Sequence, residues 1–234
     1  MLNPTHPLLQ KNITGKLFRL TQKTKTRTDK GVNGYCDIYE SYFNSLKDKP
    51  IKLLELGVGS SDAPSLKLWE TFFPNAQIIG IDHVSEYEVA TQGRVKVEIG
   101  NFLLEDFANN IINKYAPFDI IIDDAGHYQS EIITAFKKFW PHVADNGLYV
   151  IEDLLTAYCP CFEGGYRKLG TAIEFLKELI DSLHVMAYKK TPELDRFKPF
   201  NITVKDEPLD IFENTLYSMH FYQGMCFLFK GNKF

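Results

Sequence analysis

The alternation of short apolar runs with segments of helical spacing constrains the fold of this 234-residue chain more than any other feature. Apolar runs that predict strands lie at residues 51–57, 77–83, 94–101, 118–124 and 147–153. Segments with the apolar spacing of helices lie at residues 38–48, 63–73, 105–115, 130–140 and 171–183. Strands that alternate with helices form a parallel sheet with helices on both faces, which agrees with the near-continuous apolar runs.

The end of the chain has a different pattern. Residues 213–231 contain two strand-like runs joined at Gln223-Gly224, which predicts a hairpin. We therefore expect an α/β fold, a Rossmann-like and mostly parallel sheet with a C-terminal antiparallel hairpin. We also expect an N-terminal arm at residues 1–37 that contributes to a cofactor site, and a main domain at residues 38–234. The basic, Thr-rich residues 16–30 are either a solvated arm or a clamp for an anionic group.

Composition excludes several classes of protein. A net charge of -4 and a pI near 5.9 give no general attraction to nucleic acid. No apolar stretch approaches the roughly 20 residues that span a bilayer. The spacing of Cys159 and Cys161 is not one that zinc sites or redox motifs use, so the four cysteines are expected to be reduced thiols. These features predict a cytoplasmic protein that binds neither nucleic acid nor membrane.

The first predicted strand ends in two glycines, Gly57 and Gly59, which let the backbone turn tightly and approach a ligand. Ligands bind at the carboxyl ends of strands in sheets of this type. The NAD fingerprint requires a third glycine five residues after the first, and that position is Asp62. A carboxylate there disfavours a diphosphate and favours a cofactor without phosphate, such as S-adenosylmethionine. The plainer alternative is an ordinary strand-to-helix turn.

The next two strand ends carry polar groups that suit an adenosine. Asp82 follows the second strand, where an acidic residue would accept hydrogen bonds from ribose hydroxyls. Gly100 and Asn101 end the third strand and are placed to reach an adenine. Three consecutive strand ends in register predict a nucleoside site more strongly than any one of them does.

Two acidic pairs end the fourth and fifth strands, Asp123-Asp124 and Glu152-Asp153. If these strands are neighbours, about 4.8 Å apart, four carboxylates crowd one edge of the sheet. A divalent cation would neutralise them, and oxygen ligands favour Mg²⁺, with Mn²⁺ as the second choice. Because side chains alternate along a strand, only one of the first pair should bind the ion directly. The alternative is that these carboxylates cap helices or face solvent.

His127 follows the acidic pair by three residues. A lone histidine near a loop is most often structural or solvated. Beside a metal and a cofactor, His127 is instead a candidate general base, because imidazole titrates near neutral pH.

With these residues, the chain resembles the metal-dependent sugar O-methyltransferases of macrolide biosynthesis, of the mycinamicin and tylosin type. The resemblance covers about residues 26–230. It is carried by "TDKG", "LELGVGSSDAPSLKLWETFFPNAQIIGIDH", "DIIIDDAGH", "YVIEDLLTAYCPCFEGGY" and "SMHFYQGMCFLFK". The resemblance implies the class I methyltransferase fold, with S-adenosylmethionine and Mg²⁺ as cofactors.

The resemblance also implies roles for individual residues. Asp124, Glu152 and Asp153 would hold the metal, and His127 would be the base. The expected cofactor-binding residues are Thr28, Lys30, Glu55, Gly57, Gly59, Asp82, His83, Gly100, Asn101 and Asp123.

Two positions depart from the family pattern. This chain has "DDAGH" where the family usually has "DDGSH", which bears on where His127 points. Residues 156–166 match a segment that closes over the substrate, but their "CPC" replaces the usual aromatic, so the choice of sugar is expected to differ.

The expected reaction is methylation of a sugar hydroxyl. The metal would chelate two neighbouring hydroxyls, His127 would take a proton, and the oxygen would attack the methyl group of the sulfonium. The acceptor would be a nucleotide-activated sugar, a surface or capsule glycan precursor, or a glycosylated natural product. A low-GC bacterial source and a homo-oligomer are further expectations.

Three other functions stay open. A catechol-type O-methyltransferase would use the same metal with phenolic hydroxyls. A binding module would retain the cofactor pocket without chemistry. A nicotinamide oxidoreductase would bind NAD and not S-adenosylmethionine.

Overall fold

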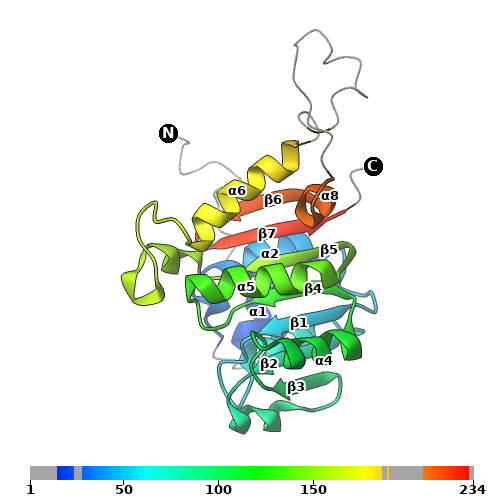
Figure 1. The fold of residues 1–234 in the computed structure, drawn as a ribbon. Coiled ribbons are helices and arrows are strands. Elements are labelled where there is room, and N and C mark those ends of the chain that lie inside the picture. Colours follow the sequence, from blue (N-terminus) through cyan, green and yellow to red (C-terminus); the bar gives the residue numbers. More distant parts are fainter. Residues whose placement is uncertain (1–14, 24–27, 186–188, 190–207, 232–234) are drawn as a thin grey trace, which may run out of the picture. The chain divides into compact units, whose positions relative to one another are not determined.

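The computed structural model describes residues 15–23, 28–185, 189 and 208–231. The chain comprises two compact units, residues 1–100 and residues 101–234, and each is described by itself. Figure 1 shows the helices and strands of both units. Among the described residues, no helix is both long enough and apolar enough to cross a membrane.

Three parallel strands form the centre of the first unit, in the order β3-β2-β1. They are β1 (Lys52–Leu56), β2 (Gln77–Asp82) and β3 (Val95–Ile99). The helices of this unit are α1 (Lys16–Lys23), α2 (Tyr35–Phe43) and α3 (Pro64–Phe72), with 3₁₀ helices η2 (Asp29–Gly31) and η3 (Ser85–Ala90). α3 packs against β2 and β3, and its Trp69 meets Tyr39 and Phe43 of α2 edge-on in the apolar core.

Four strands form the sheet of the second unit, in the order β4-β5-β7-β6. They are β4 (Phe118–Asp123), β5 (Val143–Ile151), β6 (Leu216–Tyr222) and β7 (Met225–Lys230). β4 and β5 are parallel, whereas β7 runs antiparallel to both β5 and β6. The other elements are α4 (Glu105–Tyr115), α5 (Gln129–Phe139), α6 (Ala172–His184), α8 (Ile211–Thr215), and 3₁₀ helices η4 (Trp140–His142), η5 (Leu154–Tyr158) and η6 (Pro160–Phe162).

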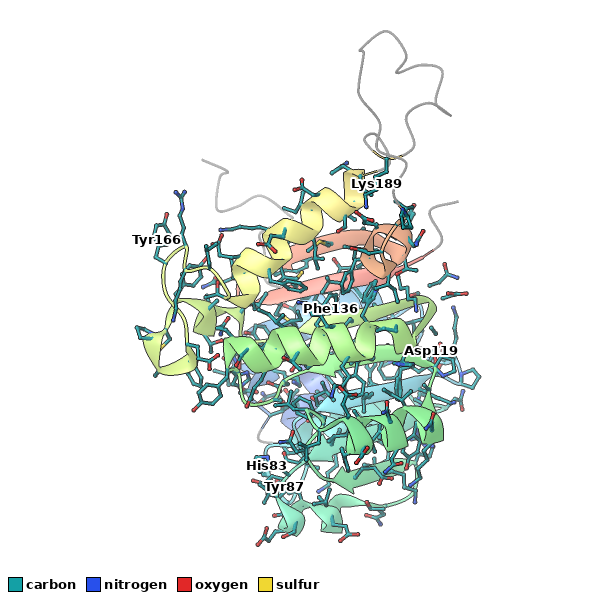
Figure 2. The ribbon with its side chains drawn as sticks, in the orientation of Figure 1. His83, Tyr87, Asp119, Phe136, Tyr166 and Lys189 are labelled. Carbon is teal, nitrogen blue, oxygen red and sulfur yellow. The ribbon has the colours of Figure 1, made fainter. Side chains whose placement is uncertain are left out.

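An aromatic cluster around Phe136 of α5 fixes this helix in the second unit (Figure 2). The Phe136 ring stacks on Phe212 of α8 at 5.4 Å and meets Tyr149 of β5 edge-on at 5.1 Å. Stacked and edge-to-face pairs of this kind add to the stabilisation from burial alone. The cluster therefore holds the second half of α5 against β5 and α8.

The predicted parallel strands and the C-terminal hairpin are confirmed, with β6 and β7 joined at residues 223–224. The boundaries differ by more than two residues at two elements: β5 begins at Val143, four residues before the predicted strand, and α2 spans Tyr35–Phe43 rather than residues 38–48. The predicted arm at residues 1–37 lies partly outside the described residues, and its boundary stays a prediction. Within that arm, α1 packs against α2 and α3.

Candidate functional site

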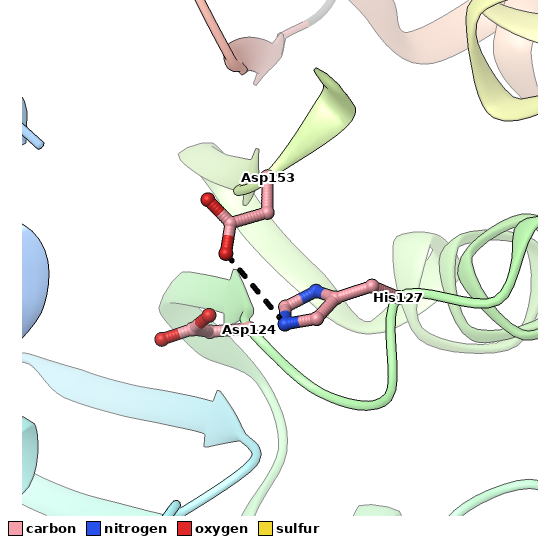
Figure 3. A group of neighbouring side chains, drawn as sticks. All are labelled: Asp124, His127 and Asp153. Atoms are coloured by element: carbon pink, nitrogen blue, oxygen red, sulfur yellow. Dashed lines mark ion pairs between the residues drawn. The ribbon is translucent and has the colours of Figure 1, made fainter. Parts of the chain in front are cut away.

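Four side chains gather where β4 and β5 end in the second unit, and we call Asp124, His127, Glu152 and Asp153 the acidic cluster. Asp124, His127 and Asp153 each offer a ligand atom within 4.8 Å of the other two. His127 Nε2 lies 3.6 Å from Asp153 Oδ2 (Figure 3). Asp124 and Glu152 also bring carboxylate oxygens within 4.8 Å of each other. The structure thus brings Asp124, Asp153 and the predicted base His127 together, and it places the third predicted ligand, Glu152, beside Asp124.

Strand pairing explains why these residues meet. Asp123 pairs with Ile151 in the parallel ladder of β4 and β5, and the Glu152 N–H donates to the Asp123 carbonyl at 3.0 Å. The residue that follows each strand is therefore delivered to the same edge.

Two residues of the acidic cluster have left-handed backbones, with φ 61° at His127 and φ 52° at Asp153. This conformation costs a non-glycine residue about 1–2 kcal/mol and persists only where the surroundings impose it. Neither Ala125 nor Gly126 has a positive φ. The loop therefore does not require glycine at either of the two small positions of "DDAGH", because the residue with the left-handed backbone is His127 itself.

The two aspartates at the end of β4 have different environments. Asp123 is 4% exposed, and its Oδ2 accepts a hydrogen bond from Tyr149 Oη at 3.1 Å. Burial raises the pKa of Asp123 to about 7, although the Tyr149 hydrogen bond acts in the opposite direction. Asp124 is partly exposed and belongs to the acidic cluster. Of the pair, only Asp124 is placed among candidate ligands, as the alternation along a strand predicts.

The donor set of the acidic cluster fits a hard divalent cation. Ligands at about 2.0–2.1 Å from Mg²⁺ are separated by at most about 4.2 Å, so atoms within 4.8 Å of one another need only a small adjustment. Carboxylates so close together repel one another unless a cation lies between them. The three carboxylates suit Mg²⁺ or Mn²⁺, because hard cations prefer oxygen ligands.

The segment after β5 is braced against the start of α5. Glu163 Oε2 accepts a hydrogen bond from the Ser130 N–H at 2.9 Å, and the Ser130 donors lower the pKa of Glu163. Phe162 lies edge-on to His127, with ring centroids 6.2 Å apart. Gly164 passes so close to the Thr156 carbonyl that a Cβ would lie 2.5 Å from it. Sequence reasoning selected this segment for substrate closure but missed the Glu163 contact.

In the first unit, we call residues 57–59 the glycine loop. Gly57 and Gly59 have φ 95° and 75°, so the expected tight turn is confirmed. Asp82 Oδ2 accepts hydrogen bonds from the N–H groups of Val58 at 2.9 Å and Gly59 at 3.4 Å. Asp82 Oδ1 accepts another from the Val84 N–H at 3.1 Å. Since a carboxylate has about four acceptor positions, Asp82 braces the loop and retains capacity for a ligand hydroxyl.

Several predicted cofactor residues lie inside the first unit. Lys30 and Glu55 are fully buried, with Lys30 Nζ 3.2 Å from Glu55 Oε1. Trp69 Nε1 donates to Glu55 Oε2 at 3.1 Å, and the Lys30 N–H donates to Thr28 Oγ1 at 3.4 Å. These contacts fix the end of the arm to β1, which sequence reasoning did not foresee.

The remaining predicted residues lie at strand ends. His83 is exposed, with its Nδ1 3.5 Å from Asp82 Oδ1. The Gly100 N–H donates to the Asp82 carbonyl at 2.8 Å. Asn101, the first residue of the second unit, accepts a hydrogen bond from the Leu103 N–H at 2.8 Å. Cofactor binding by these residues stays a prediction.

No protein-family model matches the chain. It is 32% identical to mycinamicin VI 2''-O-methyltransferase of Micromonospora griseorubida, over 82% of this chain and 47% of the relative. It is 30% identical to 8-demethyl-8-alpha-L-rhamnosyl tetracenomycin-C 2'-O-methyltransferase of Streptomyces olivaceus, over 86% of this chain and 51% of the relative. The chain spans about half the length of the curated relatives it matches.

Among solved structures, the chain is similar to MycE methyltransferase from the mycinamycin biosynthetic pathway, in complex with Mg and SAH. The TM-score is 0.81 at 28% identity, over 93% of this chain and 55% of that chain. A second structure of MycE holds Mg, SAH and mycinamycin VI. The likeness confirms the expected fold, and these neighbours were solved with Mg and with SAH, the product that S-adenosylmethionine leaves after methyl transfer.

Proposed function

Because the homologues of this chain are O-methyltransferases of sugars on glycosylated natural products, we propose that it transfers a methyl group from S-adenosylmethionine to a sugar hydroxyl. The observation that carries the proposal is the convergence of Asp124, His127 and Asp153 in one small volume. Similarity to MycE, which was solved with Mg and SAH, supports the choice of cofactors.

Each residue has a separate role in the proposed reaction. Asp124, Glu152 and Asp153 would hold the cation, and the Asp82-braced glycine loop would contribute to the cofactor site. When bound, Mg²⁺ would lower the pKa of an acceptor hydroxyl, and S-adenosylmethionine would supply the methyl group. His127 accepts the hydroxyl proton at Nε2, the nitrogen that faces Asp153.

The acceptor that we propose is a sugar already attached to a small molecule. The names of the relatives support this class, since they include mycinamicin VI and a rhamnosyl tetracenomycin. A nucleotide-activated sugar and a capsule-type glycan precursor are the other acceptors to assay. A bacterial source, cytoplasmic location and homo-oligomeric assembly remain predictions from the sequence, to be checked by cell fractionation and by light scattering.

The deciding experiment is a methyl-transfer assay with labelled S-adenosylmethionine, with and without a chelator. The panel contains glycosylated natural products, nucleotide-activated sugars and catechols. We expect chelator-sensitive labelling of a glycoside. Labelling of catechols alone would replace the proposal with a catechol-type enzyme, and an absence of labelling on every acceptor would favour a binding module.

A further inference from the structure

Gln129, the first residue of α5, is a fully buried polar side chain that contacts three separate segments. Its Nε2 donates to the His127 carbonyl at 3.0 Å and to Thr156 Oγ1 at 3.3 Å. Its Oε1 accepts a hydrogen bond from the Ala172 N–H, at the start of α6, at 3.0 Å. Both amide protons are used, so the orientation of the side chain is fixed.

Thr156 extends this connection to the acidic cluster. Its hydroxyl donates to the Asp153 carbonyl at 2.8 Å, and its N–H donates to the same carbonyl at 2.9 Å. A continuous hydrogen-bonded path therefore runs from the His127 carbonyl through Gln129 and Thr156 to the Asp153 carbonyl. We call Gln129 and Thr156 the amide clamp.

The amide clamp joins the two left-handed residues of the acidic cluster. A strained backbone persists only where its surroundings over-determine it, and hydrogen bonds to the carbonyls of His127 and Asp153 provide that restraint. The two side chains approach to 3.6 Å, so a small rotation of either backbone would change their separation. Residues that orient metal ligands from behind commonly control metal affinity.

We propose that Gln129 is a positioning residue, which holds the backbones of His127 and Asp153 through the amide clamp and, by placing the Asp153 carboxylate, sets the affinity of the acidic cluster for a divalent cation. The inference rests on the proposed function for its catalytic meaning but concerns metal binding directly. A purely structural role for Gln129 would instead lower stability and leave metal affinity unchanged.

The test measures Mn²⁺ affinity by electron paramagnetic resonance of the free ion, with neither methyl donor nor acceptor present. Gln129→Met keeps the length of the side chain and removes all three hydrogen bonds. Thr156→Val keeps its shape and removes only the hydroxyl. Thr134→Val is the matched control, because this exposed hydroxyl on α5 donates to the Ser130 carbonyl and is not part of the amide clamp.

We expect Gln129→Met and Thr156→Val each to weaken Mn²⁺ binding by about 10- to 100-fold, with the control unchanged. The double variant should be little weaker than Gln129→Met alone, because both changes break one path. Urea unfolding of each variant shows whether it is folded. If Gln129→Met is not folded, the Mn²⁺ affinity of Thr156→Val tests the positioning role.

Wild-type Mn²⁺ affinity in both folded variants would overturn the positioning role, even where methyl transfer is found. Weakened Mn²⁺ binding in a chain that methylates no acceptor would support the positioning role and count against the proposed function. A wild-type chain that binds no Mn²⁺ would overturn both.

Discussion

The glycine loop of the first unit and the acidic cluster of the second use carboxylates in opposite ways. Asp82 accepts hydrogen bonds from three backbone N–H groups, so its charge organises the chain around it. In the acidic cluster, Asp124 and Asp153 lie near each other on a loop edge that includes strained backbone. The first arrangement stabilises the fold. The second holds like charges close together, and a cation between them would offset their repulsion.

The largest expected effect comes from removing a ligand of the acidic cluster. Asp153→Asn should lower methyl transfer roughly 1,000-fold, because several kcal/mol of charge stabilisation are lost. A chelator should have the same effect on the unaltered protein. Asp181→Asn, at an exposed position of α6, is the control and should leave turnover unchanged. Full activity of Asp153→Asn would show that the acidic cluster, like the glycine loop, does not depend on a bound cation.

His127→Ala should lower kcat by about 100-fold or more, the usual contribution of a general base. S-adenosylmethionine binding, measured by calorimetry, should be preserved. His184→Ala, at the exposed end of α6, is the matched control. An unchanged kcat in His127→Ala would assign the base to another group.

The same kind of substitution should have different effects on stability in the two regions. Asp82→Asn should lower the free energy of unfolding by about 2 kcal/mol, because a charged acceptor of several N–H groups is lost. In chelator-treated protein, Asp153→Asn should change that free energy by less, because reduced repulsion from Asp124 offsets the weakened approach to His127 Nε2 at 3.6 Å. Urea denaturation measures both. A destabilised Asp153→Asn would show that this carboxylate also braces the fold.

The pKa of Asp123 predicts a dependence on pH in the metal-free protein. Because burial raises this pKa from 3.8 to about 7, folding favours the protonated carboxyl. The contribution of Asp123 to the free energy of unfolding is complete at pH values below its pKa in the unfolded state. This contribution is lost as pH rises through its pKa in the folded state. Between about pH 5 and about pH 7, wild type should therefore lose about 1.4 kcal/mol per pH unit relative to Asp123→Asn. Parallel stability curves for the two proteins would contradict this.

Much of this organisation is predictable from the sequence, because strands and helices have local periods. The register of parallel strands then explains why Asp124 and Asp153 meet, although 29 residues separate them in the sequence. Contacts that depend on distant side chains carry no local signal. The partner of Asp123 is Tyr149, and the carbonyl of His127 is restrained by a glutamine that also binds Ala172.

Burial of charge is the other feature that pattern reasoning missed. Lys30 lies in a basic stretch that suggested a solvated arm or a clamp for an anion, yet it is fully buried against Glu55. A lysine is rarely buried without a partner, and the sequence does not show which carboxylate will pair with it. The left-handed backbones of His127 and Asp153 were likewise unpredictable, since neither residue is glycine.

The most direct test of the contrast between the two regions is unfolding with and without Mg²⁺. A ligand that binds only the folded state raises the free energy of unfolding by about 2.7 kcal/mol at a concentration 100-fold above its Kd. We predict that Mg²⁺ stabilises wild type and Asp82→Asn to a similar extent and does not stabilise Asp153→Asn. Equal stabilisation of Asp153→Asn, or none of wild type, would contradict the assignment of the acidic cluster as a cation site.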